Sequence, residues 1–225
     1  MSSDRQSNLK TKGKPMTAMR TLKNNKGFTL VELAIVLVII GILLGGIIKG
    51  QELIKNAKYK RLYSTYREVV AGVYAYYDKY GKYPGDDNTA AARWTAPAAS
   101  NGNGNGYIDG GVTWCVSNSA SENCLAWQDL RLANILTGAA TPTDGRIAPN
   151  HPFGGRVAAI RADAAIGGWQ KPFAVCFEWL NNETARWLDT TYDDGVATTG
   201  SIRGNANYFG GSPDSVTAEF TCVEG

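Results

Sequence analysis

A single carboxylate inside a long apolar run constrains this chain more than any other feature. From Phe28 to Ile48 there are 21 residues, and only Glu32 among them is ionisable. An α-helix rises about 1.5 Å per residue, so this run predicts a helix of roughly 30 Å, the thickness of the hydrocarbon core of a bilayer. A charge inside a bilayer costs about 2.5–3.5 kcal/mol on insertion scales, which favours a functional role for Glu32. The alternative is that Glu32, one turn into the helix, reaches the lipid headgroups or pairs with a positive group at its own helix start.

The residues around Glu32 resemble the processing site of type IV pilins and the related pseudopilins. The matching stretch runs from Lys26 to Glu32 and reads Lys-Gly-Phe-Thr-Leu-Val-Glu, followed by the apolar helix. The resemblance implies that a prepilin peptidase/methyltransferase cuts after Gly27 and methylates the new amino group of Phe28. It also implies that Glu32 neutralises the corresponding amine of a neighbouring subunit. The motif covers only the first part of the mature chain.

Division of the chain at Gly27 separates two kinds of charge. Residues 1–27 contain seven basic residues and one acidic residue, and the remainder contains 16 basic and 19 acidic residues. The basic excess therefore lies in a leader that is expected to be removed, and nucleic-acid binding is not indicated. Met16 and Met19 are alternative starts within that leader. Basic residues before the span favour a cytoplasmic leader and an exported head. Five basic residues just beyond the span weaken this bias, so the orientation also rests on the resemblance; they are Lys49, Lys55, Lys58, Lys60 and Arg61.

The apolar run continues into an amphipathic segment without a stop signal. Apolar residues recur every three or four positions up to Tyr80, which predicts one helix from about Phe28 to about Tyr80. Gly81 and the turn at 83–85 are expected to end it. We therefore expect a leader at 1–27, a membrane-spanning and filament-core helix at 28–48, its amphipathic half at 49–83 and a head domain at 84–225.

The head is expected to have an α+β fold, with an antiparallel sheet packed on the second half of the long helix. A serine cap and spaced apolar residues predict a short helix over Ser121–Leu136. The segments Arg156–Arg161, Pro172–Trp179 and Ala218–Val223 are the candidate strands. The Asn-Glu-Thr sequence at 182–184 is expected to be exposed.

Four cysteines in the exported part suggest two disulfides; they are Cys115, Cys124, Cys176 and Cys222. Three pairings are possible, and we prefer Cys115 with Cys124 and Cys176 with Cys222. A zinc site is the weaker alternative, because no pair has the usual two-residue spacing and His151 is the only histidine.

Two loops have oxygen-rich patterns that are typical of calcium sites. The first, Asn101–Asp109, has three asparagines, and Val112 occupies the position where a calcium loop has glutamate, so a Gly/Asn turn is favoured there. The second contains Asp189, Asp193 and Asp194. Related pseudopilins often bind calcium in a head-domain loop, so the resemblance makes Ca²⁺ the one possible cofactor.

The sequence offers little support for catalysis. It has no Walker-type phosphate loop and no Gly-x-Ser-x-Gly elbow, and His151 beside Pro152 is expected to have a surface or structural role. We therefore expect a protein that is not an enzyme.

The resemblance predicts a structural subunit that waits in the bacterial inner membrane with its head outside the cytoplasm. After processing, an inner-membrane assembly platform would add it to copies of itself or to other pilins. The product would be an extracellular pilus for adhesion, motility or uptake. The alternatives are a pseudopilin of a type II secretion system, which builds a periplasmic pseudopilus, and a minor pilin that primes or tips a filament. A monomeric membrane-anchored binding module is a different class, and it would not require Glu32.

Overall fold

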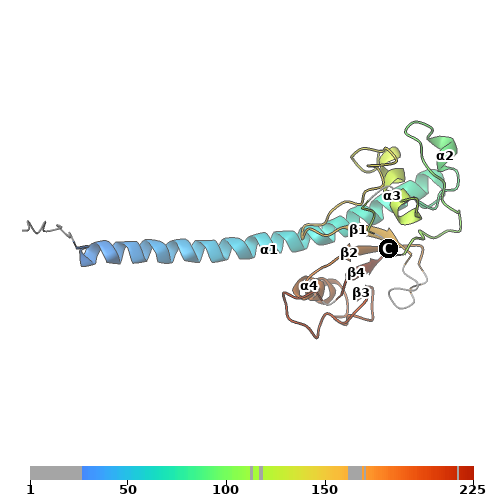
Figure 1. Cartoon of the computed structure of the whole chain (residues 1–225). Coiled ribbons are helices and arrows are strands. Elements are labelled where there is room, and N and C mark those ends of the chain that lie inside the picture. The colour runs from blue at the N-terminus through green and yellow to red at the C-terminus, as the bar shows by residue number, and fades with distance from the viewer. Residues whose placement is uncertain (1–26, 112–113, 117–118, 162–168, 170, 217) are drawn as a thin grey trace, which may run out of the picture. The chain divides into compact units, whose positions relative to one another are not determined.

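The computed structural model describes residues 27–225 except 112–113, 117–118, 162–168, 170 and 217. The chain forms two compact units, Met1–Ile48 and Lys49–Gly225. The element order is one long helix, two short helices, two strands, a fourth helix and two further strands, as Figure 1 shows.

The long helix α1 spans Leu30–Tyr80 and confirms the single helix predicted from the apolar periodicity. Its end follows from backbone chemistry. Gly81 adopts a positive φ of 68°, and its N–H donates to the carbonyl of Tyr77 at 2.7 Å. A left-handed residue directly after a helix is the common position for glycine, because other side chains crowd the backbone there.

A four-stranded antiparallel sheet forms the second layer of the Lys49–Gly225 unit, in the order β1-β2-β4-β3 (Figure 1). Its strands are β1 (Val157–Ile160), β2 (Ala174–Glu178), β3 (Ile202–Gly204) and β4 (Phe220–Glu224). Strands β1 and β2 lie within the predicted segments, and β4 overlaps the third, extending one residue beyond it to Glu224. The sequence analysis missed β3, because its three residues are too few to show an alternating pattern.

Two helices pack around this sheet and the second half of α1. Helix α3 (Glu122–Leu132) confirms the predicted short helix, although it ends earlier than expected, where Asn134 adopts a positive φ of 59°. Helix α4 (Asn182–Tyr192) was not predicted. A further single turn, α2, covers Ala90–Arg93.

The start of α4 corrects one expectation about exposure. Asn182 and Thr184 of the Asn-Glu-Thr sequence are buried rather than exposed. The side chain of Asn182 donates to the Ser212 carbonyl at 3.0 Å and to the Ser215 hydroxyl at 2.8 Å. Asn181 caps the helix by accepting from the N–H of Thr184. The polar residues here stabilise a buried helix start, so their type did not indicate a surface loop.

Aromatic contacts fasten α4 to α1. The Tyr59 ring stacks on Trp187 with centroids 4.6 Å apart, and Tyr63 stacks on Tyr192 at 3.6 Å. The main core lies beneath these contacts, between α1, α3 and one face of the sheet. It includes Leu62, Val73, Tyr76, Trp127, Phe173, Val175 and Phe177, all fully buried. The spaced tyrosines of α1 therefore include packing residues.

Two disulfides close the fold, in the pairing that the sequence analysis preferred. Cys115 bonds to Cys124 at the start of α3, and Cys176 bonds to Cys222. The second pair lies directly opposite in the β2 and β4 register, so it links the two central strands of the sheet.

Candidate functional site

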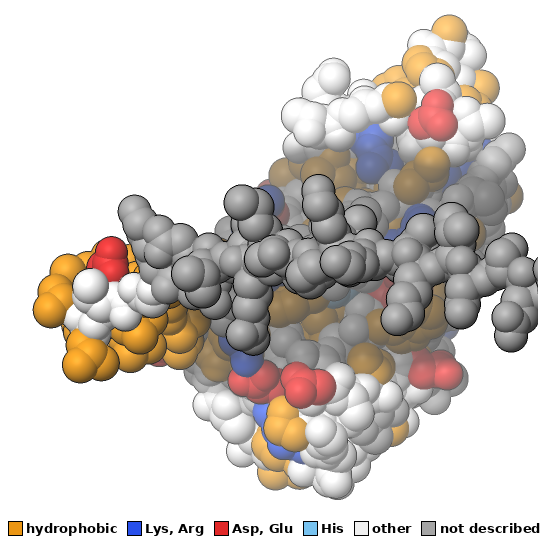
Figure 2. Space-filling model, turned by 60° about the vertical axis from the view of Figure 1, so that its left-hand side comes forward, with side chains coloured by type: hydrophobic (Ala, Val, Ile, Leu, Met, Phe, Trp, Pro, Cys, Tyr) orange, Lys and Arg blue, Asp and Glu red, His pale blue; other side chains and the backbone are white. Residues whose placement is uncertain are grey.

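The start of α1 holds the residues expected to act in processing and assembly. Gly27 and Phe28 directly precede the helix, and the Phe28 side chain is 82% exposed. Every residue from Gly27 to Lys49 is exposed. In Figure 2 hydrophobic side chains cover this first part of α1. Within the described residues, α1 is long and apolar enough to cross a membrane. Residues 1–26 of the predicted leader lie outside the described residues.

Glu32 forms a reciprocal cap with Thr29. The Glu32 Oε2 atom accepts from the Thr29 backbone N–H at 2.8 Å and from the Thr29 hydroxyl at 2.9 Å. In return the Thr29 Oγ1 atom accepts from the N–H of Glu32 at 3.2 Å. This is a capping box, in which a threonine and a glutamate three residues later satisfy each other's backbone donors. The sequence analysis missed it, although Thr-x-x-Glu before an apolar run is its usual signature.

The capping box uses only one of the two carboxylate oxygens. Within the described part of the chain, the Glu32 Oε1 atom accepts no hydrogen bond. The cap therefore satisfies one oxygen within the subunit and leaves the other available to a donor from elsewhere. Peptide cleavage after Gly27 would not disturb the cap, because none of its atoms belongs to Gly27 or Phe28.

The structure brings Asp189, Asp193 and Asp194 together at the end of α4. One carboxylate oxygen from each lies within 4.8 Å of the others. Asp189 is buried, and burial raises the pKa of its carboxyl group, with the charges of Asp193 and Asp194 adding to the effect. Gly195 follows with a positive φ of 75°, and its N–H donates to Asp189 at 2.8 Å.

Existing hydrogen bonds limit what these three aspartates can offer a cation. Asp189 also accepts from the Tyr208 hydroxyl, Asp193 accepts from the N–H of Ile202 at 2.6 Å, and Asp194 accepts from Thr199. Carboxylate oxygens have more than one lone pair, and three clustered negative charges suit a hard cation such as Ca²⁺. The three carboxylates therefore fit a calcium ion. Carbonyl oxygens of the protein and water would have to supply the remaining ligands of the six to eight that Ca²⁺ takes.

The asparagine-rich loop from Asn101 to Asp109 has a different organisation. The side-chain oxygens of Asn103 and Asn105 each accept from the backbone N–H two residues later, at 2.9 Å. The amide nitrogens of both side chains donate to Asp109. These are Asx turns, so the asparagine oxygens bind the loop's own backbone. This agrees with the Gly/Asn turn favoured from the sequence.

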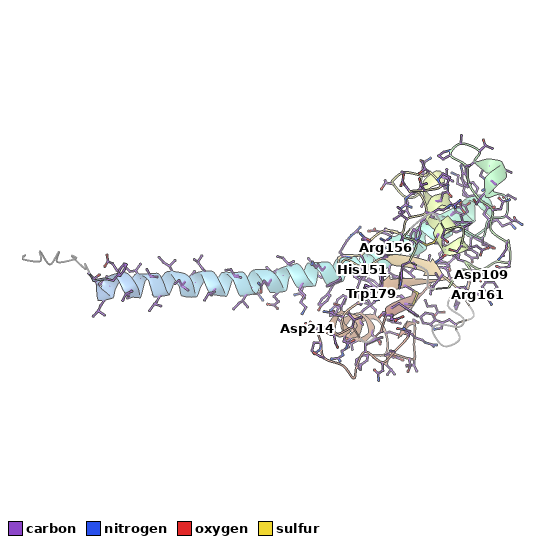
Figure 3. All side chains as sticks on the ribbon, viewed as in Figure 1. Asp109, His151, Arg156, Arg161, Trp179 and Asp214 are labelled. Atoms are coloured by element: carbon purple, nitrogen blue, oxygen red, sulfur yellow. A yellow bond between two sulfur atoms is a disulfide. The ribbon has the colours of Figure 1, made fainter. Side chains whose placement is uncertain are left out.

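Two acidic side chains anchor the same loop to the head. Buried Asp86 accepts from the N–H groups of Asn105 and Gly106, and Glu122 of α3 accepts from those of Asn103 and Asp109. Asp109 also lies 3.5 Å from Arg161, at one end of β1 (Figure 3). These carboxylates have a structural role in positioning the loop.

His151 also has structural hydrogen bonds. The residue is 4% exposed, and its Nε2 lies 2.8 Å from the carbonyl of Glu178, the last residue of β2. In Figure 3 His151 lies at the end of the sheet away from Arg161. Its Nδ1 accepts from the N–H of Phe153 at 3.2 Å, which assigns the proton to Nε2. Burial lowers the pKa of this imidazole, so the ring is neutral at pH 7. Both ring nitrogens are engaged by backbone groups, which supports the structural role expected from the sequence.

Comparison with known proteins identifies the start of the chain. Residues 22–48 match the family model of the prokaryotic N-terminal methylation motif. No curated protein and no solved structure matches the chain. The matched region contains Gly27, Phe28, Thr29 and Glu32, and it indicates processing of the prepilin type. It suggests a structural subunit rather than an enzyme, and together with the apolar helix it fits membrane insertion before assembly. The chain therefore carries, at its N-terminus, the hallmark motif of the type IV pilins and pseudopilins.

Proposed function

We propose that this protein is a type IV pilin-like structural subunit. It is cut after Gly27, methylated on Phe28, held in the inner membrane by residues 28–48 and then assembled into a helical filament. The observation that carries the proposal is the methylation motif at 22–48, whose one intramembrane carboxylate, Glu32, keeps an oxygen available at the start of an exposed apolar helix.

Assembly follows from two requirements of this helix. Its apolar side chains need lipid or protein around them, and neighbouring helices in a filament replace the lipid. The Glu32 carboxylate is costly in a low-dielectric core unless it is paired, and the terminal amine of Phe28 from a second copy supplies the opposite charge. A contact of this kind between different parts of two copies does not close on itself, so its repetition gives a fibre.

The test separates the charge of Glu32 from its capping role. Glu32→Ala removes both, whereas Glu32→Gln keeps an oxygen and an amide that can form the cap and removes only the charge. We expect both variants to insert into the membrane and to be cut after Gly27, and we expect filament yield to fall at least ten-fold in both. Filament yield is measured by shearing and immunoblotting, and cleavage is measured by N-terminal sequencing.

Two results would contradict the proposal. Wild-type filament yield from Glu32→Gln would show that no ion pair is needed. An exported chain that still carries its leader, without a free amine on Phe28, would remove the processing step itself.

A pseudopilin of a type II secretion system is the second candidate. The observation that favours it is the clustering of Asp189, Asp193 and Asp194, because the sequence resembles pseudopilins that bind calcium in a loop of the head. The head exceeds that of a compact major pseudopilin, which favours a pilin. Electron microscopy of cells with the labelled protein separates the two: label on surface fibres indicates a pilus, and label confined to the periplasm indicates a pseudopilus.

A further inference from the structure

The stretch Lys49–Arg61, which directly follows the apolar run, is strongly basic. It contains five basic residues and one acidic residue, Glu52, a net charge of +4. Residues 62–225 contain eleven basic and seventeen acidic residues, a net charge of −6. The positive charge of the mature chain is thus concentrated beside the predicted membrane span. We call the five basic residues the basic collar; they are Lys49, Lys55, Lys58, Lys60 and Arg61.

The side chains of the basic collar are exposed and point in different directions around the helix. At 100° per residue its members lie at several different angles around α1. All five side chains are exposed. The collar therefore offers positive charge in several directions around α1, flanking the side on which Tyr59 packs against α4.

Contacts within the protein do not hold these charges firmly. Lys49 pairs with Glu52 at 2.6 Å, and Lys55 and Arg61 pair with Glu183 and Glu68. All six side chains of these pairs are at least 40% exposed, and exposed ion pairs exchange readily with other partners.

The other two cations of the collar are Lys58 and Lys60. Lys58 lies over the Phe153 ring at 5.8 Å. Across the part of the chain that the structure describes, neither Lys58 nor Lys60 pairs with a carboxylate.

We propose that, before assembly, the basic collar binds the anionic phospholipid headgroups of the outer leaflet. The inference rests on the proposed membrane-inserted subunit and names a partner for that state. Along the helix, Lys55 is about 10 Å and Lys60 about 18 Å beyond Ile48. Each headgroup layer is roughly 5–8 Å thick, and charges interact across a further Debye length of about 8 Å. Lysine stems also bend towards the membrane surface, so the whole collar is within reach of the headgroups.

Two further arguments favour lipid over an acidic protein surface. Basic residues next to a membrane span usually stay in the cytoplasm, so five of them on the outer side disfavour the proposed orientation. An anionic membrane surface beside them would offset this unfavourable free energy. Each basic residue close to such a surface strengthens binding about five-fold. The same surface repels the acidic remainder of the head, so an anionic membrane should bind the collar in preference to the rest of the head.

The experiment uses the full processed chain in vesicles of phosphatidylcholine alone and in vesicles with phosphatidylglycerol added. Flotation and resistance to carbonate extraction first establish insertion. Lysines are then labelled with an amine-reactive reagent and quantified by peptide mass spectrometry. We expect labelling of Lys49, Lys55, Lys58 and Lys60 to slow at least three-fold in the anionic vesicles and to recover in high salt. Lys79 and Lys82, more than 30 residues beyond Ile48, serve as internal controls and should not change.

A pair of charge-matched variants sharpens the test. In Lys58→Gln/Lys60→Gln, the slowing of Lys49 and Lys55 labelling by anionic vesicles should be at least two-fold smaller, because half of the collar lysines are removed. In Lys79→Gln/Lys82→Gln the labelling of the collar lysines should be slowed as much as in the wild-type chain.

The possible failures are distinguishable. Equal labelling in both kinds of vesicle, with insertion intact, would overturn the lipid contact and leave the proposed subunit standing. If labelling of the collar lysines also slows in neutral vesicles, and slows further as the protein density rises, the partner is a second copy of the chain. That result would also overturn the lipid contact. A chain that neither floats nor resists carbonate would overturn the membrane-inserted subunit together with this inference.

Discussion

Thr29 and Glu32 act as a unit at the first turn of α1. Two of their three hydrogen bonds satisfy backbone donors that a helix start otherwise leaves unpaired, and inside a bilayer no water is present to replace them. The cap therefore lowers the cost of the glutamate in the proposed membrane-inserted subunit, although its charge still lacks a cation there. In the proposed assembly step, the charged carboxylate would then meet the amine of a second copy through the oxygen that the cap leaves unused.

Thr29→Val should weaken this helix start, because valine has a similar shape but no hydroxyl. Loss of a cap of this kind costs about 1 kcal/mol, which corresponds to roughly five-fold faster exchange of the Glu32 amide. Hydrogen exchange of the full chain in detergent micelles measures the exchange rate of the Glu32 amide. Thr29→Ser keeps the hydroxyl and should exchange as the wild type does. Equal exchange in the valine and serine variants would show that the cap is not formed.

Asp129 is the second residue whose chemistry the fold changes. It is 1% exposed on α3, and it accepts from the N–H of Gly85 at 2.7 Å. Burial raises the pKa of its carboxyl group from 3.8 to about 7, with the charge of Asp87 adding to the effect and Arg93 and Arg146 opposing it. The folded protein therefore retains a proton that the unfolded chain loses at about pH 4.

This gives a stability that depends on pH with a defined sign. Because the folded state binds the proton more tightly, the free energy of unfolding should fall as pH rises from about 4 to about 7, by about 4 kcal/mol, and then level off. In Asp129→Asn this pH-dependent fall in the free energy of unfolding should disappear. The variant should therefore be more stable than the wild type at pH 8. Denaturant unfolding followed by tryptophan fluorescence measures the profile. Asp78→Asn, at an exposed site on α1, should keep the wild-type slope; parallel profiles for Asp129→Asn and wild type would contradict the assignment.

At the scale of elements, the two disulfides close loops of different length. Cys115–Cys124 spans 9 residues, whereas Cys176–Cys222 spans 46 and contains α4 and β3. The longer loop removes more conformational freedom from the unfolded chain when it is closed.

Removal of each bridge by paired Cys→Ala changes should therefore have unequal effects. Loop-closure entropy predicts a loss of about 2.5 kcal/mol for Cys115–Cys124 and about 4 kcal/mol for Cys176–Cys222. All four side chains are buried to the same degree, so the cavity contribution is similar in both pairs. Unfolding in urea gives both values. The reverse order would show that the bridges act through native contacts rather than through the unfolded state.

At the scale of the whole molecule, charge is divided along the chain. The collar beside the span is positive and the rest of the head is negative. Three of the acidic groups meet where α4 passes into the loop before β3, and we propose that this cluster binds Ca²⁺. Burial raises the pKa of Asp189 and repulsion from Asp193 and Asp194 adds to it; bound calcium would offset that repulsion.

Calcium should accordingly raise the melting temperature of the head, and a chelator should lower it. At a calcium concentration 100 times the dissociation constant, the gain is about 2.7 kcal/mol. Asp193→Asn/Asp194→Asn should abolish the response, whereas Asp214→Asn, at an exposed site outside the cluster, should keep it. A melting temperature that responds to neither calcium nor chelator would rule the site out.

The sequence by itself determined the features that are local in the chain. The apolar run, its single carboxylate, the helix to Tyr80 and the family motif all depend on neighbouring residues and a fixed helical period, so they could be predicted. Three of the four strands could also be located, because their apolar runs are long enough to recognise.

Only the tertiary structure decided the features that depend on distant partners. Helix α4 has polar residues at its start, and it forms because Tyr59 and Tyr63 of α1 provide aromatic rings for Trp187 and Tyr192. Three-residue β3 exists because β4 lies beside it. The pKa of Asp129 and the meeting of three aspartates arise from burial and proximity, which sequence spacing does not encode.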